Sequence, residues 1–129
     1  MSPDTKGAPA RVLVLDVEAT DLKADIGYAM CVCAKWLGEK AMWKRSLMSY
    51  PSWKRDKTDD RALLRDVYRL AMQADIVVTH YGGPGGYDWR FLQGRMVIKR
   101  VGVLPPALHF VLLFNARSKM ALRSNSLFS

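Results

Sequence analysis

The segment "RVLVLDVEATDL", residues 11–22, joins an apolar run directly to a pair of acids. Valine and leucine alternate from Val12 to Leu15, Asp16 follows, and Glu18 comes two residues later. A continuous apolar run of this kind predicts a strand from Arg11 to Asp16 at the centre of a sheet, covered on both faces. Because burial of an unpaired carboxylate is costly, the two acids at the end of the strand require an explanation.

The spacing of Asp16 and Glu18 suggests one explanation. Side chains at positions i and i+2 of a strand point the same way, with Cα atoms about 6.5–7 Å apart. Both carboxylates could therefore reach one hard cation, and Mg²⁺ prefers oxygen ligands. The alternative is an ordinary strand end with two solvated acids, and this pair alone does not decide between the two interpretations.

The rest of the chain predicts an α/β domain. Strands are expected at Tyr28–Leu37, Ala41–Leu47 and Ile76–Thr79, and helices at Asp59–Ala74 and Tyr87–Val101. Thr58 or Asp59 can cap the first helix. The order β-β-β-α-β-α implies a mixed central sheet flanked by helices. Residues 1–10 are predicted to be a flexible leader and residues 11–129 a single domain, in which the segment from His109 begins as a strand or turn.

Charge is distributed unevenly along the chain. The net charge is +8, and all twelve acids lie between Asp4 and Asp88. The segment from Trp89 to Ser129 holds seven bases: Arg90, Arg95, Lys99, Arg100, Arg117, Lys119 and Arg123. A basic half favours a polyanionic partner, nucleic acid first, although a basic surface without a partner explains the same count. No apolar run is long enough for a membrane span, and no signal sequence is recognisable, so a cytoplasmic location is expected.

Two smaller patterns each allow two interpretations. The first predicted helix carries an arginine every four residues, at Arg61, Arg65 and Arg69. These side chains could form a ridge that faces phosphates, or they could form an ordinary solvated face. Cys31 and Cys33 point the same way on a strand, where they are poorly placed for a disulfide. They are interpreted as small buried hydrophobic residues, and a pair without further cysteines is weak support for a zinc site.

A second segment could also carry chemistry. In "ADIVVTHYGGPGGYDWRFL", residues 74–92, an apolar strand ends at His80, a glycine-rich loop follows, and Asp88 lies in the first turn of the next helix. An acid at that position is favoured by the helix dipole, and a histidine at a strand end is commonly structural. The glycines could simply form a turn, or they could let a nucleic acid strand approach the backbone.

Together the two segments resemble the DEDD superfamily of 3′–5′ exonucleases. "DVEATDL", residues 16–22, is similar to the first exonuclease motif, and "THYGGPGGYDWRFL", residues 79–92, is similar to the second. The closest resemblance is to the DnaQ-like, DNA-polymerase-B-type enzymes of phages and bacteria, and it extends from Val12 to Leu127. It implies a ribonuclease H-like fold, a role in DNA replication or repair, and hydrolysis of phosphodiester bonds by a two-metal mechanism, with single-stranded DNA the favoured substrate.

The resemblance also assigns roles to residues. It implies that Asp16, Glu18 and Asp88 are catalytic and bind Mg²⁺ or Mn²⁺, with two ions in the site. It places a further set beside the substrate: Thr20, Leu22, His80, Tyr81, Tyr87 and Arg90. Phe91 occupies an aromatic position of the motif that belongs to the core.

The chain departs from the family in its last part. The family takes a fourth carboxylate from a third motif on a final helix, but no acid follows Asp88. Relative to the family the domain is therefore expected to be shortened at its C-terminus, with that helix missing or incomplete. Asp21, Asp25, water or another chain could complete the site. Alternatively, the protein is a catalytically impaired module that binds nucleic acid, or a protein partner, through its basic half. The uncovered sheet face would then favour a homodimer or such a partner.

Overall fold

The protein, described by a computed structural model over residues 9–21, 23–79, 87–104 and 108–111, is an α/β domain built on one five-stranded sheet. The sheet consists of β1 (Val12–Ala19), β2 (Ala29–Trp36), β3 (Trp43–Ser46), β4 (Ile76–Thr79) and β5 (Leu108–Val111), in the order β3-β2-β1-β4-β5. β1, β2 and β3 are antiparallel neighbours, whereas β4 runs parallel to β1 and β5 parallel to β4. The predicted mixed α/β architecture is confirmed.

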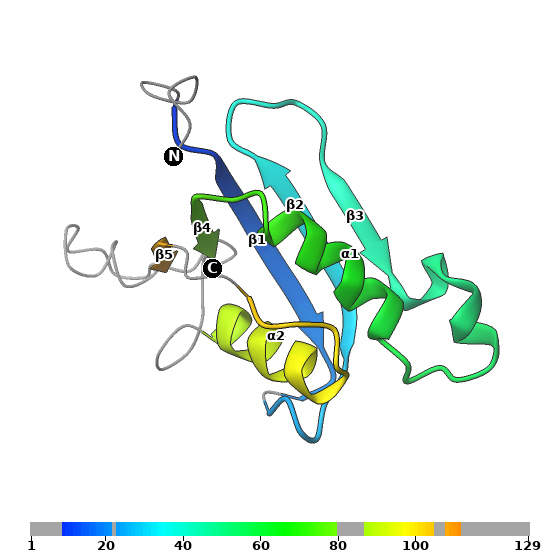
Figure 1. The fold of residues 1–129 in the computed structure, drawn as a ribbon. Helices are drawn as coiled ribbons and strands as arrows, with labels where there is room; N and C mark the ends of the chain where they lie inside the picture. The colour runs from blue at the N-terminus through cyan, green and yellow to red at the C-terminus, as the bar shows by residue number, and fades with distance from the viewer. Residues whose placement is uncertain (1–8, 22, 80–86, 105–107, 112–129) are drawn as a thin grey trace, which may run out of the picture.

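Two helices lie on one side of this sheet, as Figure 1 shows. They are α1 (Arg61–Ala71), between β3 and β4, and α2 (Tyr87–Ile98), between β4 and β5. Two short 3₁₀ turns, η2 (Leu47–Ser49) and η3 (Pro51–Lys54), lead from β3 towards α1. Between the sheet and the helices lies the core, whose most deeply buried members include Leu13, Leu15, Val32, Leu63, Leu64, Val67, Val77, Leu92 and Met96.

The sequence prediction for β1 is wrong in one respect. Leu13, Leu15 and Val17 are buried, but Val14, Asp16 and Glu18 between them are exposed, with Val14 38% exposed. Only one face of β1 is therefore packed against the described helices, and a strand of this kind alternates in burial. Because Val and Leu occupy both faces of residues 12–15, the apolar run conceals this alternation.

The boundaries of the other elements differ from the prediction by a few residues. β4 spans the predicted Ile76–Thr79, and β5 confirms a strand in the segment that includes His109. α2 ends at Ile98 rather than Val101, because Arg100 adopts a left-handed conformation (φ 56°) and the Val101 amide donates to the Met96 carbonyl, which closes the helix. α1 begins after Asp60 rather than at Asp59, and the predicted caps Thr58 and Asp59 lie outside the cap position.

Within the described residues, no helix is long and apolar enough to cross a membrane. The expectation that the final helix is missing or incomplete concerns residues 112–129, which lie outside the described part of the chain, as does the leader up to residue 8.

Candidate metal centre

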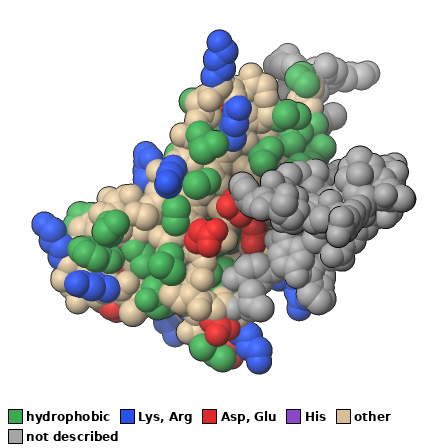
Figure 2. Space-filling model, turned by 180° about the vertical axis from the view of Figure 1, so that it is seen from behind, with side chains coloured by type: hydrophobic (Ala, Val, Ile, Leu, Met, Phe, Trp, Pro, Cys, Tyr) green, Lys and Arg blue, Asp and Glu red, His purple; other side chains and the backbone are tan. Residues whose placement is uncertain are grey.

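We call the face of the sheet opposite α1 and α2 the uncovered face, with reference to the described helices alone. Asp16 and Glu18 lie on it because side chains along a strand alternate between its two faces. β1 has eight residues, but it pairs with β4 only from Val12 to Val14. Its last residues therefore extend past the end of β4, where no described strand pairs with that edge of β1. Both acids point away from the helices and are exposed. Figure 2, which views the molecule from behind, shows acidic side chains gathered near the middle of this face.

Asp88 enters the same corner from α2. It is the second residue of the helix and is only 4% exposed. The backbone N–H of Val17, on the edge of β1 that β4 leaves open, donates a hydrogen bond to the Asp88 carboxylate. This bond joins the start of α2 to β1 at the residue between the two acids, so three carboxylates from two elements meet at one corner of the sheet.

The charges of these carboxylates act on one another. The pKa of Asp88 is raised to about 7, mainly because burial disfavours its charged form, and also by the negative charges of Asp16 and Glu18. The hydrogen bond from Val17 opposes this rise only in part. An acid whose pKa is raised in this way, by burial first and by two nearby acids second, is typical of functional sites. The sequence motifs grouped these three residues, and the structure brings their charges together.

This donor set suits a hard divalent cation in its chemistry. Carboxylate oxygens are the ligands that Mg²⁺ and Mn²⁺ prefer, and a cation would relieve the repulsion that raises the pKa of Asp88. As they are arranged, however, the described residues contain no group of three or more histidine, cysteine, aspartate or glutamate side chains close enough to hold a metal ion. Asp16, Glu18 and Asp88 thus interact electrostatically, without the closer approach that joint coordination needs.

The loop after β1 is tied back onto β2. The Thr20 amide donates to the Tyr28 carbonyl at 3.1 Å, and the Tyr28 amide donates to the Thr20 hydroxyl at 3.0 Å. Asp21 accepts from the Lys23 amide at 2.9 Å. Thr20 therefore ties the loop after β1 to β2 in this structure. These two hydrogen bonds give Thr20 a structural role that requires no substrate.

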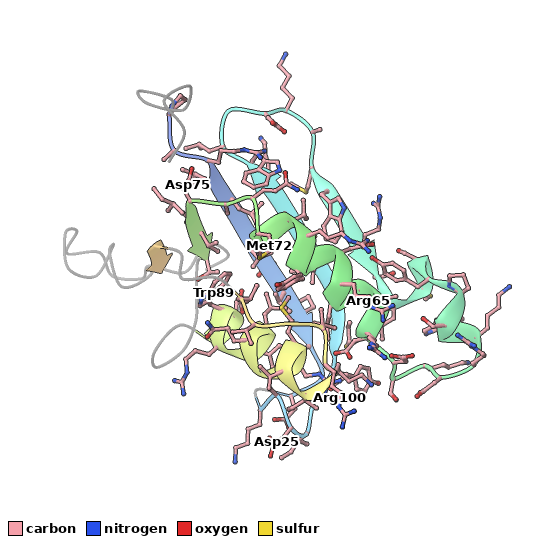
Figure 3. All side chains as sticks on the ribbon, viewed as in Figure 1. Asp25, Arg65, Met72, Asp75, Trp89 and Arg100 are labelled. Atoms are coloured by element: carbon pink, nitrogen blue, oxygen red, sulfur yellow. The ribbon has the colours of Figure 1, made fainter. Side chains whose placement is uncertain are left out.

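Asp25, a candidate for the fourth carboxylate, lies away from the other three. Figure 3 shows Asp25 at the tip of the loop after β1, far from Trp89, which marks the start of α2 beside Asp88. Asp21 is nearer in sequence to β1, and its backbone packs against Gly27, where a Cβ atom would lie 2.8 Å from the Asp21 nitrogen. This arrangement gives no support to Asp25 as a ligand of the same cation.

The other predicted substrate residues are described only in part. Leu22, His80 and Tyr81 lie outside the described residues, and so does the side chain of Tyr87, although its backbone begins α2. Arg90 is exposed on α2. Phe91 is 2% exposed, which confirms its place in the core.

A buried ion pair that the sequence analysis did not anticipate joins the two helices to β2 and to the loop after β1. The Arg95 guanidinium donates to both carboxylate oxygens of Asp60, at 2.7 and 2.9 Å, and to the Ala24 carbonyl at 3.0 Å. Asp60 also accepts from the Ala29 amide at 2.9 Å. The pair thus joins the start of α1, the body of α2, the first residue of β2 and the loop after β1. No motif marks it, since Asp60 resembles a helix-capping acid and Arg95 a surface base.

This ion pair lowers the number of bases after Asp88 that can serve an external partner. Arg95 is buried against Asp60, and the Lys99 ammonium lies 3.7 Å from Asp59. Two of the bases counted as a nucleic acid surface therefore neutralise acids within the domain. Arg117, Lys119 and Arg123 lie outside the described residues. Arg61, Arg65 and Arg69 are exposed along α1, on the side of the sheet opposite Asp16 and Glu18, and Arg69 pairs with Asp66.

The two cysteines lie beside the acids rather than in the core. Cys33 pairs with Asp16 across β1 and β2, and Cys31 pairs with Glu18. Both thiols are free and only partly buried, so the prediction that they are buried residues is wrong. Burial and the nearby Cys31 thiol raise the pKa of Cys33, which keeps this thiol neutral next to the carboxylates.

A comparison of the chain with models of known protein families finds no match. A comparison with curated proteins also finds none that is significantly similar.

Proposed function

We propose that this protein is a metal-dependent 3′–5′ exonuclease that hydrolyses phosphodiester bonds in single-stranded DNA. The observation that carries the proposal is the meeting of Asp16, Glu18 and Asp88 at one corner of the sheet, where the two exposed acids help to raise the pKa of the buried one to about 7. Three interacting acids, one of them buried, on the residues that the motif resemblance selects favour a cation-binding role over three unrelated charges.

The sheet supports the finer assignment to a ribonuclease H-like fold. Three antiparallel strands come first, and a helix then crosses to β4, which lies parallel beside β1 on its other edge. The first motif falls on the central strand and the second at the start of α2. A fold of the exonuclease lineage requires this placement of the two motifs, because only then do they share a corner.

Asp16, Glu18 and Asp88 would hold the cations in this proposal. When bound, two Mg²⁺ or Mn²⁺ ions would lower the pKa of the attacking water and neutralise charge on the phosphate. Asp88 must lose its proton to act as a ligand, since a protonated carboxyl coordinates poorly. The hydrogen bond from the Val17 backbone ties the Asp88 carboxylate to the residue of β1 that lies between the two exposed acids.

A second candidate function is a catalytically impaired module that binds nucleic acid. It is favoured by the absence, among the described residues, of three ligands close enough for one metal ion. The lack of any acid between Trp89 and Ser129 also favours it, because that part of the sequence cannot supply a fourth carboxylate.

Digestion of single-stranded DNA labelled at its 5′ end distinguishes the two functions. The exonuclease predicts a ladder of shortening products that requires Mg²⁺ or Mn²⁺ and is lost in Asp16→Asn. Asp75→Asn, which removes an exposed acid at the start of β4, is the control and should leave the ladder unchanged. DNA binding without any cleavage would instead support the binding module, and the absence of both would refute the two candidates together.

A further inference from the structure

The uncovered face of the sheet carries an ordered row of side chains beyond the acids. Partners across an antiparallel pair point to the same face. Asp16 is paired with Cys33, and Cys33 is paired with Lys44 on β3. Val14 is paired with Lys35 in the same way. Two lysines therefore lie on the same face as the candidate metal site, on the strands that separate it from the edge of the sheet.

Both lysines are exposed. Within the part of the chain that the structure describes, neither ammonium group takes part in an ion pair, in contrast to Arg95 and Lys99. Figure 2 shows Lys or Arg side chains on this face, beyond the acids and towards β3. Within the described residues, no acid therefore neutralises these two positive charges.

Between the acids and the lysines, this face of β2 carries two cysteines and no acid. Cys33 separates Asp16 from Lys44, and Cys31 lies two residues before it on the same face. Both cysteines are free and partly buried, so this stretch places no carboxylate in the path of an anion. A chain of phosphates could therefore pass from the acids to the lysines over β2.

The spacing suits a strand that leaves the metal centre. Neighbouring strands are about 4.8 Å apart, so Lys44 on β3 lies roughly 10 Å from Asp16 on β1. Phosphates along one strand of B-DNA are about 3.4 Å apart along the axis, and an extended strand spaces them further. An ammonium group at this distance meets a phosphate one to three nucleotides from the one held by the acids.

We propose that Lys35 and Lys44 form a phosphate track, which binds the backbone of single-stranded nucleic acid as it runs across the uncovered face from Asp16 towards β3. This inference rests on the proposed function for its ligand class and extends it to the path of the strand. Contacts to phosphates carry no base information, so the track binds strands of any sequence.

Equilibrium binding of a fluorescein-labelled oligothymidine of about 15 nucleotides tests the track. The measurement is fluorescence anisotropy in EDTA at several salt concentrations, so that no hydrolysis occurs. Each phosphate contact to a single strand contributes a slope of about −0.7 to the logarithm of affinity against the logarithm of salt. Lys35→Gln combined with Lys44→Gln should therefore flatten the slope by about 1.4. If the native protein and this double variant bind equally near 1 M salt, the affinity of the double variant at about 0.1 M salt should be 10- to 30-fold lower than that of the native protein.

Two further variants make the result specific. Arg61→Gln with Arg65→Gln removes the same charge from the exposed face of α1, on the other side of the sheet, and should change the slope little. Lys35→Arg with Lys44→Arg keeps the charge and should retain binding. If the α1 variant lost as much affinity as the lysine-to-glutamine variant, the arginines of α1 rather than the two lysines would be assigned the phosphate contacts. An unchanged slope in the lysine-to-glutamine variant would overturn the track. Absence of binding by the native protein would overturn it as well.

This test is independent of catalysis. Cleavage that fails in every variant while binding depends on the lysines would refute the exonuclease and leave the track in place. If cleavage required Asp16 but DNA binding was unchanged in the lysine-to-glutamine variant, the track alone would be refuted.

Discussion

Asp88 is the residue on which the candidate site depends most. Its pKa of about 7 lies above the ordinary value of 3.8, so the folded protein holds a proton that the unfolded chain releases. Stability therefore falls as pH rises from about 4 through about 7, because over this range the native state binds more protons than the unfolded state. The burial of Asp88 therefore costs stability once the pH rises above the pKa of the unfolded chain.

Asp88→Asn should remove much of this pH dependence. The amide cannot ionise, and its oxygen can still accept the hydrogen bond from Val17. Without metal, we expect the native protein to lose about 1–2 kcal/mol more than the variant between about pH 5 and pH 8, after discounting for solvent screening. Urea unfolding in EDTA at the two pH values measures the difference. Parallel losses in the two proteins would show that Asp88 is not the group that titrates.

At the scale of elements, the Asp60–Arg95 ion pair connects α1 and α2 to β2 and to the loop after β1. Arg95→Met leaves the Asp60 carboxylate buried without its partner, and breaking a buried pair from one side costs about 3–5 kcal/mol. Arg69→Met is the matched control, since the Arg69 side chain is 73% exposed in its pair with Asp66 and should cost less than about 1 kcal/mol. Urea unfolding curves give both values, and similar costs would contradict the assigned role of Arg95.

The close approach of α2 to the loop after β1 gives a second prediction at this scale. A Cβ atom on Gly94 would lie 2.7 Å from the Cβ atom of Ala24, and neither atom can move without its backbone. Gly94→Ala should therefore destabilise the protein by about 1–3 kcal/mol, although the same change in an open helix stabilises it by about 0.5–1 kcal/mol. Thermal unfolding measures the effect. Adding Ala24→Gly should recover most of the loss, and a double variant no better than the single one would exclude this contact as the cause.

At the scale of the whole molecule, local patterns predicted the architecture better than they predicted burial. Apolar runs and turn residues were sufficient for the order of the strands and helices, and the spacing of Asp16 and Glu18 was sufficient to place both acids on one face. The burial of Asp60 and Arg95 was not predictable, because an acid before a helix and a base within it have the same pattern whether or not they meet. Their pairing depends on how α1 and α2 pack, which no single segment encodes.

The same reasoning applies to the cysteines. Their spacing correctly predicted a shared face, but their apolar neighbours suggested the core. The uncovered face became apparent only when both described helices were seen to lie on the other side of the sheet. The count of bases after Asp88 overstated the free positive charge for a similar reason. It included Arg95 and Lys99 as surface bases, although each pairs with an acid from the segment before α1.

A cation at the candidate site would link the sheet to a helix and so stabilise the entire domain. Asp16 and Glu18 belong to β1 and Asp88 to α2, so unfolding must release any ion that they share. At a Mn²⁺ concentration 100 times its dissociation constant, the free energy of unfolding should rise by about 2.7 kcal/mol. Asp16→Asn should lose most of this gain, whereas Asp25→Asn should keep it, because Asp25 lies far from the start of α2. Thermal unfolding with and without Mn²⁺ measures the gain. If Asp25→Asn also lost the stabilisation by Mn²⁺, Asp25 would be a ligand, and the loop after β1 would have to close over the site. If Asp16→Asn kept the full stabilisation, the ion would bind elsewhere, and the proposed exonuclease would lose its chemical basis.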